Sequence, residues 1–232
     1  MPSLTTLSQV DWFPLWLSLR VAALATIFVL TAGTSTAYVL SHKTFRGKAL
    51  IESLITLPLV LPPTVLGYYL LVLVGRESLP GVIYEKLFGQ PLVFTWQAAV
   101  VAAILHAAPL YVRAARAVLE TVDYRYEWAA NSLGASELRT FFSVTLPLAW
   151  RGLSALASLS FARSLGDFGI TMMVAGNIPG RTQTLSVAIF DAVESGNGHL
   201  ARLLVIIVSA VAILLVWAAG SLSRYSRVGG IE

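Results

Sequence analysis

Long apolar blocks alternate with short polar ones along most of the chain. The apolar blocks cover residues 12–40, 50–74, 92–118, 151–175 and 199–221. Each is long enough for an α-helix to cross a bilayer, which takes about 20 residues. Because backbone N–H and C=O groups must be paired within lipid, these blocks are expected to be helical. The pattern predicts an all-α, polytopic membrane protein with about five transmembrane helices, in a single domain over 1–232.

Basic residues gather in alternate connections between these predicted spans. The connections on the richer side are 41–48, with two lysines and one arginine, and 113–151, with five arginines. Fewer basic residues lie in 75–91 and 176–198. Cytoplasmic loops carry an excess of Lys and Arg, so we expect 41–48, the segment 119–150 and the C-terminus to be cytoplasmic. An odd number of spans then leaves the N-terminus outside.

The composition agrees with a membrane protein and excludes several other classes. The chain is 56% hydrophobic and 12% charged, against about 25% charged residues in soluble domains. The net charge of +4 is explained by the cytoplasmic loops, and no basic run with interleaved aromatics indicates nucleic-acid binding. The absence of cysteine excludes disulfides and thiolate chemistry. Residues 1–11 lack a basic n-region, so no cleaved signal peptide is expected.

The polar segment 119–150, between the third and fourth predicted spans, has its own helical pattern. A first helical run ends at Gly134, which readily adopts a left-handed conformation. Ser136 is a candidate N-cap for a second run, which is expected to stop at Leu146-Pro147. A short helix with small residues on one face suits docking into a groove of a partner.

Several prolines fall inside the predicted spans, and two of them are adjacent. Pro62 and Pro63 each lack an N–H, so the carbonyl one turn earlier must find another partner. We therefore expect a helix break at 61–64 that faces the bundle interior. Such a break either lines a transport path or marks a kinked packing helix.

Two charged residues, Arg163 and Asp167, are predicted within the fourth span. Their spacing of four residues allows an ion pair on one helix face, and the alternative is a site facing the path or gate. Gly166 and Gly169 beside them permit close helix approach. His106, in the third span, is interpreted as a hydrogen-bonded packing residue.

Segment 181–196 is too short and too polar for a span. We expect an amphipathic helix at the outer interface, either re-entering the membrane or forming an ordinary loop helix.

Motifs for catalysis are missing from the sequence. There is no G-x-x-x-x-G-K-[ST] phosphate loop, no H-E-x-x-H and no G-x-S-x-G. No carboxylate cluster indicates a metal or acid–base site. The chain is therefore expected to be no enzyme and to bind no cofactor or metal itself.

The polar segment resembles the coupling-helix signature of ABC importer permeases. The similarity rests on Ala129, Ala130 and Gly134, with Leu146-Pro147 at the family's distance. The signature's usual first Glu is replaced by Trp128, and Glu127 stands one residue earlier. The resemblance implies a type I ABC importer transmembrane domain that docks on a cytosolic ATPase through this segment. The implied coupling residues are Glu127, Ala129, Ala130, Gly134, Leu146 and Pro147.

Further motifs are similar to those of the molybdate permeases within this family. They are Phe45-Arg46-Gly47-Lys48-Ala49-Leu50, Leu57 to Pro63, Phe161 to Gly169, and Asn177-Ile178-Pro179-Gly180. The resemblance implies a homodimer in the bacterial cytoplasmic membrane, with two ABC ATPase subunits that use ATP and an external or periplasmic molybdate-binding protein. The residues proposed for the path or gate are Pro62, Pro63, Arg163, Gly166, Asp167 and Gly169.

Two alternatives remain open at this point. One is a tungstate or sulfate permease of the same architecture. The other is an ion-coupled secondary transporter, for which only Asp167 and His106 would offer titratable groups within the spans.

Overall fold

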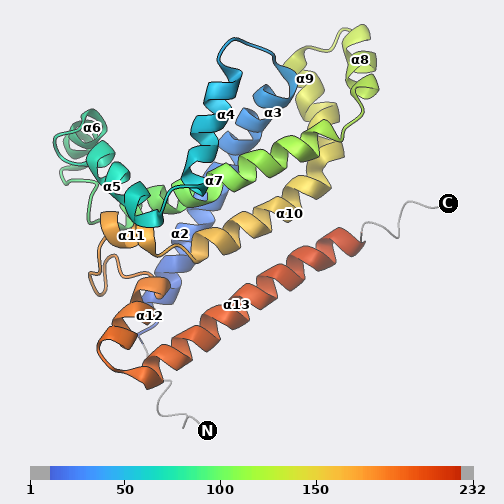
Figure 1. Cartoon of the computed structure of the whole chain (residues 1–232). Coiled ribbons are helices and arrows are strands. Elements are labelled where there is room, and N and C mark those ends of the chain that lie inside the picture. Colours follow the sequence, from blue (N-terminus) through green and yellow to red (C-terminus); the bar gives the residue numbers. More distant parts are fainter. Residues whose placement is uncertain (1–10, 226–232) are drawn as a thin grey trace.

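The computed structural model describes residues 11–225, and every regular element in that range is a helix (Figure 1). The all-α expectation is confirmed for this part of the chain. The α-helices are α2 (Phe13–Phe28), α3 (Thr34–His42), α4 (Lys48–Thr56), α5 (Pro63–Val74), α6 (Leu79–Phe88), α7 (Trp96–Glu120), α8 (Tyr124–Ser132), α9 (Glu137–Thr140), α10 (Leu146–Leu165), α11 (Gly169–Val174), α12 (Leu185–Glu194) and α13 (Gly198–Tyr225). Two π-helical turns, η1 (Val29–Gly33) and η3 (Phe141–Thr145), and one 3-10 turn, η2 (Leu57–Leu59), lie between them.

Within residues 11–225, two helices are long and apolar enough to cross a membrane by themselves. They are Phe13–His42, in which α2, η1 and α3 are continuous, and Trp96–Glu120. Lys48–Leu59 and Pro63–Val74 qualify together as a third, broken span. The count of about five spans and their orientation stay predictions.

The second predicted span, 50–74, is broken next to Pro62-Pro63, where the sequence predicted a helix break. The chain bends by 116° between Lys48–Leu59 and Pro63–Val74, and Pro63 becomes the first residue of α5. A proline is tolerated at that position because the first N–H of a helix has no intrahelical partner.

The fourth predicted span, 151–175, is not one continuous helix. Helix α10 begins earlier, at Leu146, and ends at Leu165, and the short α11 follows from Gly169 after a turn. Gly166 caps α10, and its N–H donates to the carbonyl of Ala162.

Alanine-rich faces bring the long helices close together in the core. Helix α7 buries alanines at 98, 99, 102, 103, 107 and 115, and it packs against α2, α3 and α10. Small side chains permit this close approach. Tyr111, on α7, shares a hydrogen bond of 2.6 Å with Thr34, on α3.

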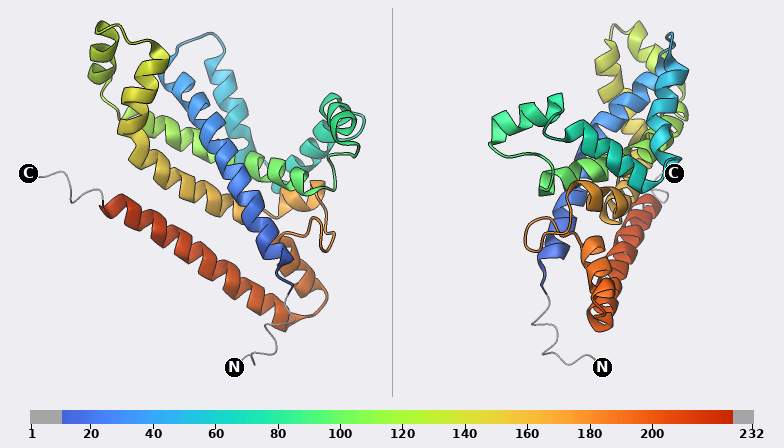
Figure 2. Two further views of the ribbon diagram at one scale, coloured as in Figure 1. Left: turned by 180° about the vertical axis from the view of Figure 1, so that it is seen from behind. Right: turned by 60° about the vertical axis from the view of Figure 1, so that its left-hand side comes forward.

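The two ends of the fold carry different elements. Helices α8 and α9 lie at one end, beside the connection from α3 to α4 (Figure 1). Helix α12 lies near the start of α2, at the opposite end, and α13 runs back alongside α10 (Figure 2). The connections 41–48 and 119–150 therefore share one end of the molecule, as their basic residues predicted. The helix expected within 181–196 is α12, which packs on α13 and α2.

Candidate coupling surface and translocation path

Helix α8 begins and ends where local sequence signals predict. The carboxylate of Asp123 accepts the N–H of Arg125 at the helix start, which is ordinary N-cap chemistry. Gly134 ends the helix with a φ of +85°, and the N–H of Ala135 returns to the carbonyl of Ala130 at 3.1 Å. A hydrogen bond to the carbonyl five residues earlier, following a glycine with positive φ, is the Schellman motif that ends many helices. The prediction that Gly134 terminates the first helical run is confirmed.

Helix α9 restarts the helical path at the predicted cap. The hydroxyl of Ser136 accepts the N–H of Arg139 at 3.4 Å. The hydroxyl of Thr140 donates to the side-chain carbonyl of Asn131 at 2.9 Å. That bond joins α9 to α8, so we treat the two short helices as one unit.

The second helical run does not stop at Leu146-Pro147, contrary to the expectation. Helix α9 continues through the π-helical turn η3 into α10, and Pro147 lies in the first turn of α10. Pro147 cannot donate to the carbonyl one turn back. A π-turn placed there changes the hydrogen-bond register, so the chain accommodates the proline without ending the helix.

Glu127 points into the protein, where it joins α8 to two other elements. It is 8% exposed, and its carboxylate accepts the Thr145 hydroxyl at 2.5 Å and Nε2 of His42 at 3.0 Å. Because a carboxylate only accepts, Nε2 of His42 must carry the proton. The ring of His42 also stacks on Tyr38, with centroids 4.3 Å apart. Trp128 occupies the signature's first position, and the neighbouring Glu127 uses its carboxylate for hydrogen bonds within its own chain.

Large apolar side chains cover the outward surface of α8 and α9. Leu133 is 90% exposed and Leu138 is 73% exposed. Trp128 is exposed as well, beside Tyr124 at a centroid distance of 4.8 Å. Exposed apolar surface with neighbouring polar groups marks an interaction site. We call these residues, with Tyr126, the coupling surface: Tyr124, Tyr126, Trp128, Leu133 and Leu138.

An ion pair outside the membrane-spanning helices also ties this unit to the connection after α3. Nζ of Lys43 lies 2.7 Å from each carboxylate oxygen of Glu137. This hydrogen bond and the charge of Lys43 lower the pKa of Glu137 below its ordinary value.

The two helix breaks pack directly against each other. A Cβ added to Gly169, at the start of α11, would lie 2.7 Å from Cβ of Pro63, at the start of α5. A Cβ on Gly67 would lie 2.6 Å from Cβ of Met173. Only glycine allows these two approaches. The broken segments 57–63 and 166–168 therefore meet at one junction.

Arg163 and Asp167 do not form the pair that their spacing suggested. The helix ends between them, so they no longer share a face. The guanidinium of Arg163 donates to the backbone carbonyl of His106 at 3.0 Å. Asp167 is 4% exposed and accepts the N–H and hydroxyl of Thr171, in the first turn of α11. Nδ1 of His106 lies 3.9 Å from Asp167, so His106 is not isolated.

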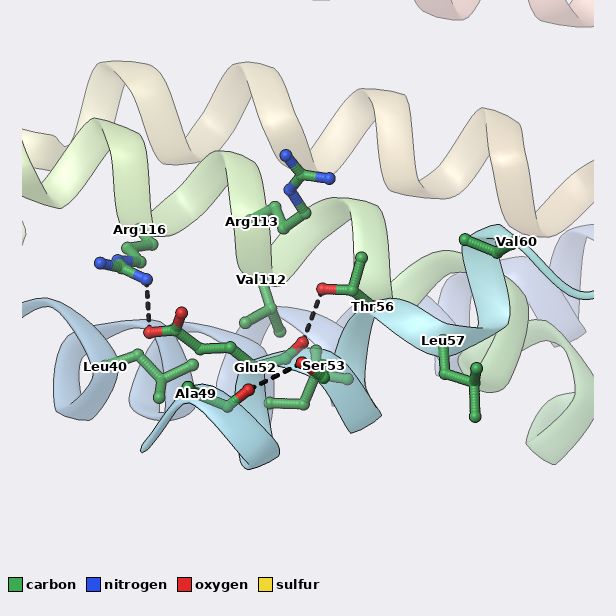
Figure 3. Close-up of a pocket in the computed structure, with 11 residues that line it drawn as sticks. Leu40, Ala49, Glu52, Ser53, Thr56, Leu57, Val60, Val112, Arg113 and Arg116 are labelled. Atoms are coloured by element: carbon green, nitrogen blue, oxygen red, sulfur yellow. Dashed lines mark hydrogen bonds and ion pairs between the residues drawn. The ribbon is translucent and has the colours of Figure 1, made fainter. Parts of the chain in front are cut away.

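A cleft with a cavity volume of about 590 Å³ lies between α4–η2 and the last third of α7 (Figure 3). Nη1 of Arg116 pairs with Glu52 across it at 2.6 Å, and Nε of Arg116 pairs with Glu120 at 2.7 Å. Sequence reasoning did not single out these residues. The polar spacing of Glu52, Ser53 and Thr56 on a broken span is the signal that could have found the cleft.

Comparison with known families identifies the class. Residues 29–227 match the family described as "Binding-protein-dependent transport system inner membrane component". The chain belongs to this family. Its members are membrane components of transport systems that work with a binding protein, so the expectations of a transport subunit rather than an enzyme, and of an inner-membrane location, are confirmed.

Individual relatives are similar over nearly the whole chain. The molybdenum transport system permease protein ModB of Escherichia coli (strain K12) is 43% identical, over 95% of this chain and 97% of its own length. The sulfate transport system permease protein CysT of Salmonella typhimurium is 32% identical, over 95% of this chain and 84% of its own.

A solved transporter has the same fold. The MetNI methionine ABC transporter, in an inward-facing conformation, superimposes with a TM-score of 0.69 at 17% identity, covering 97% of this chain and 99% of that one. The fold of this family member is therefore that of a type I ABC importer permease, as expected.

Proposed function

We propose that this permease is the membrane subunit of an ATP-driven molybdate importer. Two copies would form the path, two cytosolic ABC ATPases would bind the coupling surfaces, and an external molybdate-binding protein would deliver the anion. The coupling surface is the observation that carries this proposal. A polar segment that is capped, internally bonded and covered with exposed apolar side chains is built for a protein partner.

The anchoring of α8 explains how the partner's movement would reach the membrane. Glu127 ties α8 to His42 at the end of the first span and to Thr145 at the root of α10. A displacement of the coupling surface would therefore move two long helices together. ATP would act by binding one conformation of the complex better than the other.

The junction of the two helix breaks is the proposed gate. Pro62, Pro63, Gly166 and Gly169 interrupt regular helix there, and irregular backbone at membrane depth is tolerated only inside protein or along a wet cavity. Arg163 and Asp167 would stabilise the junction, since each bonds an element beside it.

The choice of molybdate rests on the relatives. The ModB sequence is more similar to this chain than the CysT sequence is, by 43% against 32%. The substrate would be tested by reconstituting the permease with its ATPase and binding protein in liposomes. Molybdate uptake should require ATP, and an excess of unlabelled molybdate should compete better than sulfate. Tungstate, which has the same shape and charge, is the stricter competitor.

An ion-coupled carrier is the rival, and the same liposomes test it. Asp167 holds the first turn of α11 by accepting two hydrogen bonds from Thr171, so its bonds have a structural explanation that needs no proton transfer. Uptake driven by an ion gradient without any ATPase would overturn the ABC proposal.

Docking on the ATPase has its own test. Leu133→Asp, in the middle of the coupling surface, should reduce copurification of the ATPase. Leu79→Asp is the matched control, because Leu79 is 81% exposed at the start of α6. Equal copurification of the ATPase with both variants would count against the docking role.

A further inference from the structure

The cleft between α4–η2 and α7 contains one guanidinium that is not committed to a partner. Arg116 is held by two carboxylates, Glu52 and Glu120. The side chain of Arg113 is exposed, and within residues 11–225 it makes no ion pair or hydrogen bond. Figure 3 draws it without a dashed contact to any neighbour.

The position of Arg113 makes contact with lipid unfavourable. It lies seven residues before the end of α7, about 10 Å along a helix axis. Helix α7 is long and apolar enough to span a membrane by itself. Charged groups inside such helices face the protein interior or a water-filled cavity. Glu52 and Arg116 line the same cleft, so three charged groups gather at one depth.

One positive charge in the cleft has no carboxylate partner and can meet an anion that passes through. Two arginines and one glutamate line the cleft, and Glu120 also pairs with Arg116. The four charges cancel in sum, and within residues 11–225 Arg113 is the member without an ion-pair partner. The hydroxyls of Ser53 and Thr56 already donate to carbonyls one turn back. Arg113 is therefore the group with free donors, and the planar guanidinium binds two oxygens of an oxyanion at once. Glu52 opposes tight binding, which favours release.

We propose that Arg113 forms a transient binding site for the transported tetrahedral oxyanion. The site would lie at the end of the transport path that is on the same side of the molecule as α8 and α9. This inference rests on the proposed function, because it assumes that an oxyanion crosses the membrane through this permease. It adds a contact residue on the path, at the coupling end and away from the proposed gate.

The first test uses the complete transporter in liposomes, with molybdate uptake and ATP hydrolysis measured together. Arg113→Gln should lower the molybdate imported per ATP by about tenfold, the order expected for losing a charged hydrogen bond. Arg113→Lys should be less affected, since it keeps the charge. Arg46→Gln is the matched control: it removes the same charge at the same end of the fold, outside the cleft.

The second test does not depend on transport rates. The chain has no cysteine, so Ser53→Cys puts a single thiol in the cleft that Arg113 also lines. Molybdate should slow its reaction with a water-soluble thiol reagent, and Arg113→Gln in the same chain should abolish this protection. Glu52→Gln should increase the protection, because it removes the opposing charge.

Different outcomes would overturn the Arg113 site and the proposed function. Wild-type import per ATP in Arg113→Gln, or an equal loss in Arg46→Gln, would overturn the site. So would unprotected Ser53→Cys in a transporter that imports molybdate. If the wild-type complex imports no molybdate, tungstate or sulfate, the proposed function itself fails, and the site with it.

Discussion

His42 and Glu127 are 85 residues apart in sequence, and Nε2 of the first lies 3.0 Å from Oε2 of the second. The contact joins the end of the first span to the first turns of α8. Thr145 is a second partner of Glu127, at 2.5 Å. One buried carboxylate thus attaches α8 to both α3 and η3.

Removing that carboxylate should loosen the whole unit. Glu127→Ala leaves the hydroxyl of Thr145 and Nε2 of His42 without their acceptor. Thr145 is fully buried, so its unsatisfied hydroxyl costs about 1–3 kcal/mol. The thermal unfolding temperature of the purified permease should fall, and ATPase copurification should fall with it.

Two further variants serve as controls for Glu127→Ala. Glu127→Gln keeps an acceptor oxygen for Thr145 and should be milder. Glu137→Ala, at an exposed glutamate of the same unit, should leave the unfolding temperature almost unchanged. Equal stability of Glu127→Ala and Glu137→Ala would contradict the anchoring role.

A side chain at Gly134 should strain the backbone, although space is available for it. Its φ is +85° and nothing lies within 4 Å of the place that a Cβ would take, so the cost is backbone strain of about 1–2 kcal/mol rather than a clash. Gly134→Asp adds a charge beside Leu133 on the coupling surface. It should weaken ATPase association while leaving membrane insertion intact.

Gly89 provides the matched control for that variant. Its φ is +70° and its surroundings are equally open, but it ends α6. Gly89→Asp should carry a similar strain and retain the ATPase. A pull-down with the ATPase compares the two variants. If both lost the ATPase, backbone strain alone would explain the weaker binding of Gly134→Asp.

The proposed gate can be tested with two glycines three residues apart. In Gly169→Ala the new methyl group would lie 2.7 Å from Cβ of Pro63, so α11 and α5 must separate. Overpacking of this kind costs about 1–3 kcal/mol. In Gly166→Ala the nearest atoms are 3.7 Å away, which is ordinary contact.

Transport should therefore fall strongly in Gly169→Ala and little in Gly166→Ala. Uptake per ATP hydrolysed is the informative measurement, since a gate defect changes it without removing the ATPase. Similar uptake in the two variants would argue against a role for the α5–α11 junction.

Much of the fold could be predicted from local patterns. The long apolar blocks, the break at Pro62-Pro63, the end of α8 at Gly134 and the cap at Ser136 each depend on a few neighbouring residues. The grouping of basic residues correctly placed 41–48 and 119–150 at one end. These features follow from helix chemistry and from the bilayer's demand for paired backbone groups.

The remaining features depend on contacts between distant segments. Arg163 and Asp167 were expected on one face because spacing alone does not show that α10 ends at Leu165. Pro147 was expected to stop a helix because a π-turn has no clear sequence signal. The side chains that bind Glu127 come from other helices, so its inward orientation could not be inferred from α8 alone.

The pair of Lys43 and Glu137 should respond to pH and salt. Lys43 holds the pKa of Glu137 below its ordinary value. A lowered folded-state pKa means that the pair's stabilisation is complete above the ordinary value of 4.5 and is lost as the pH falls through the lowered value. Because both side chains are exposed, salt should screen the interaction at any pH.

A double-mutant cycle isolates this effect from the rest of the molecule. The unfolding temperatures of Lys43→Ala, Glu137→Ala and the double variant would be compared with the parent chain at neutral pH and low salt. The coupling between the two positions should be small at neutral pH, smaller in high salt, and absent well below pH 4.5. A coupling that persisted in strong acid would mean that packing of the Lys43 side chain, rather than its charge, joins the connection after α3 to α9.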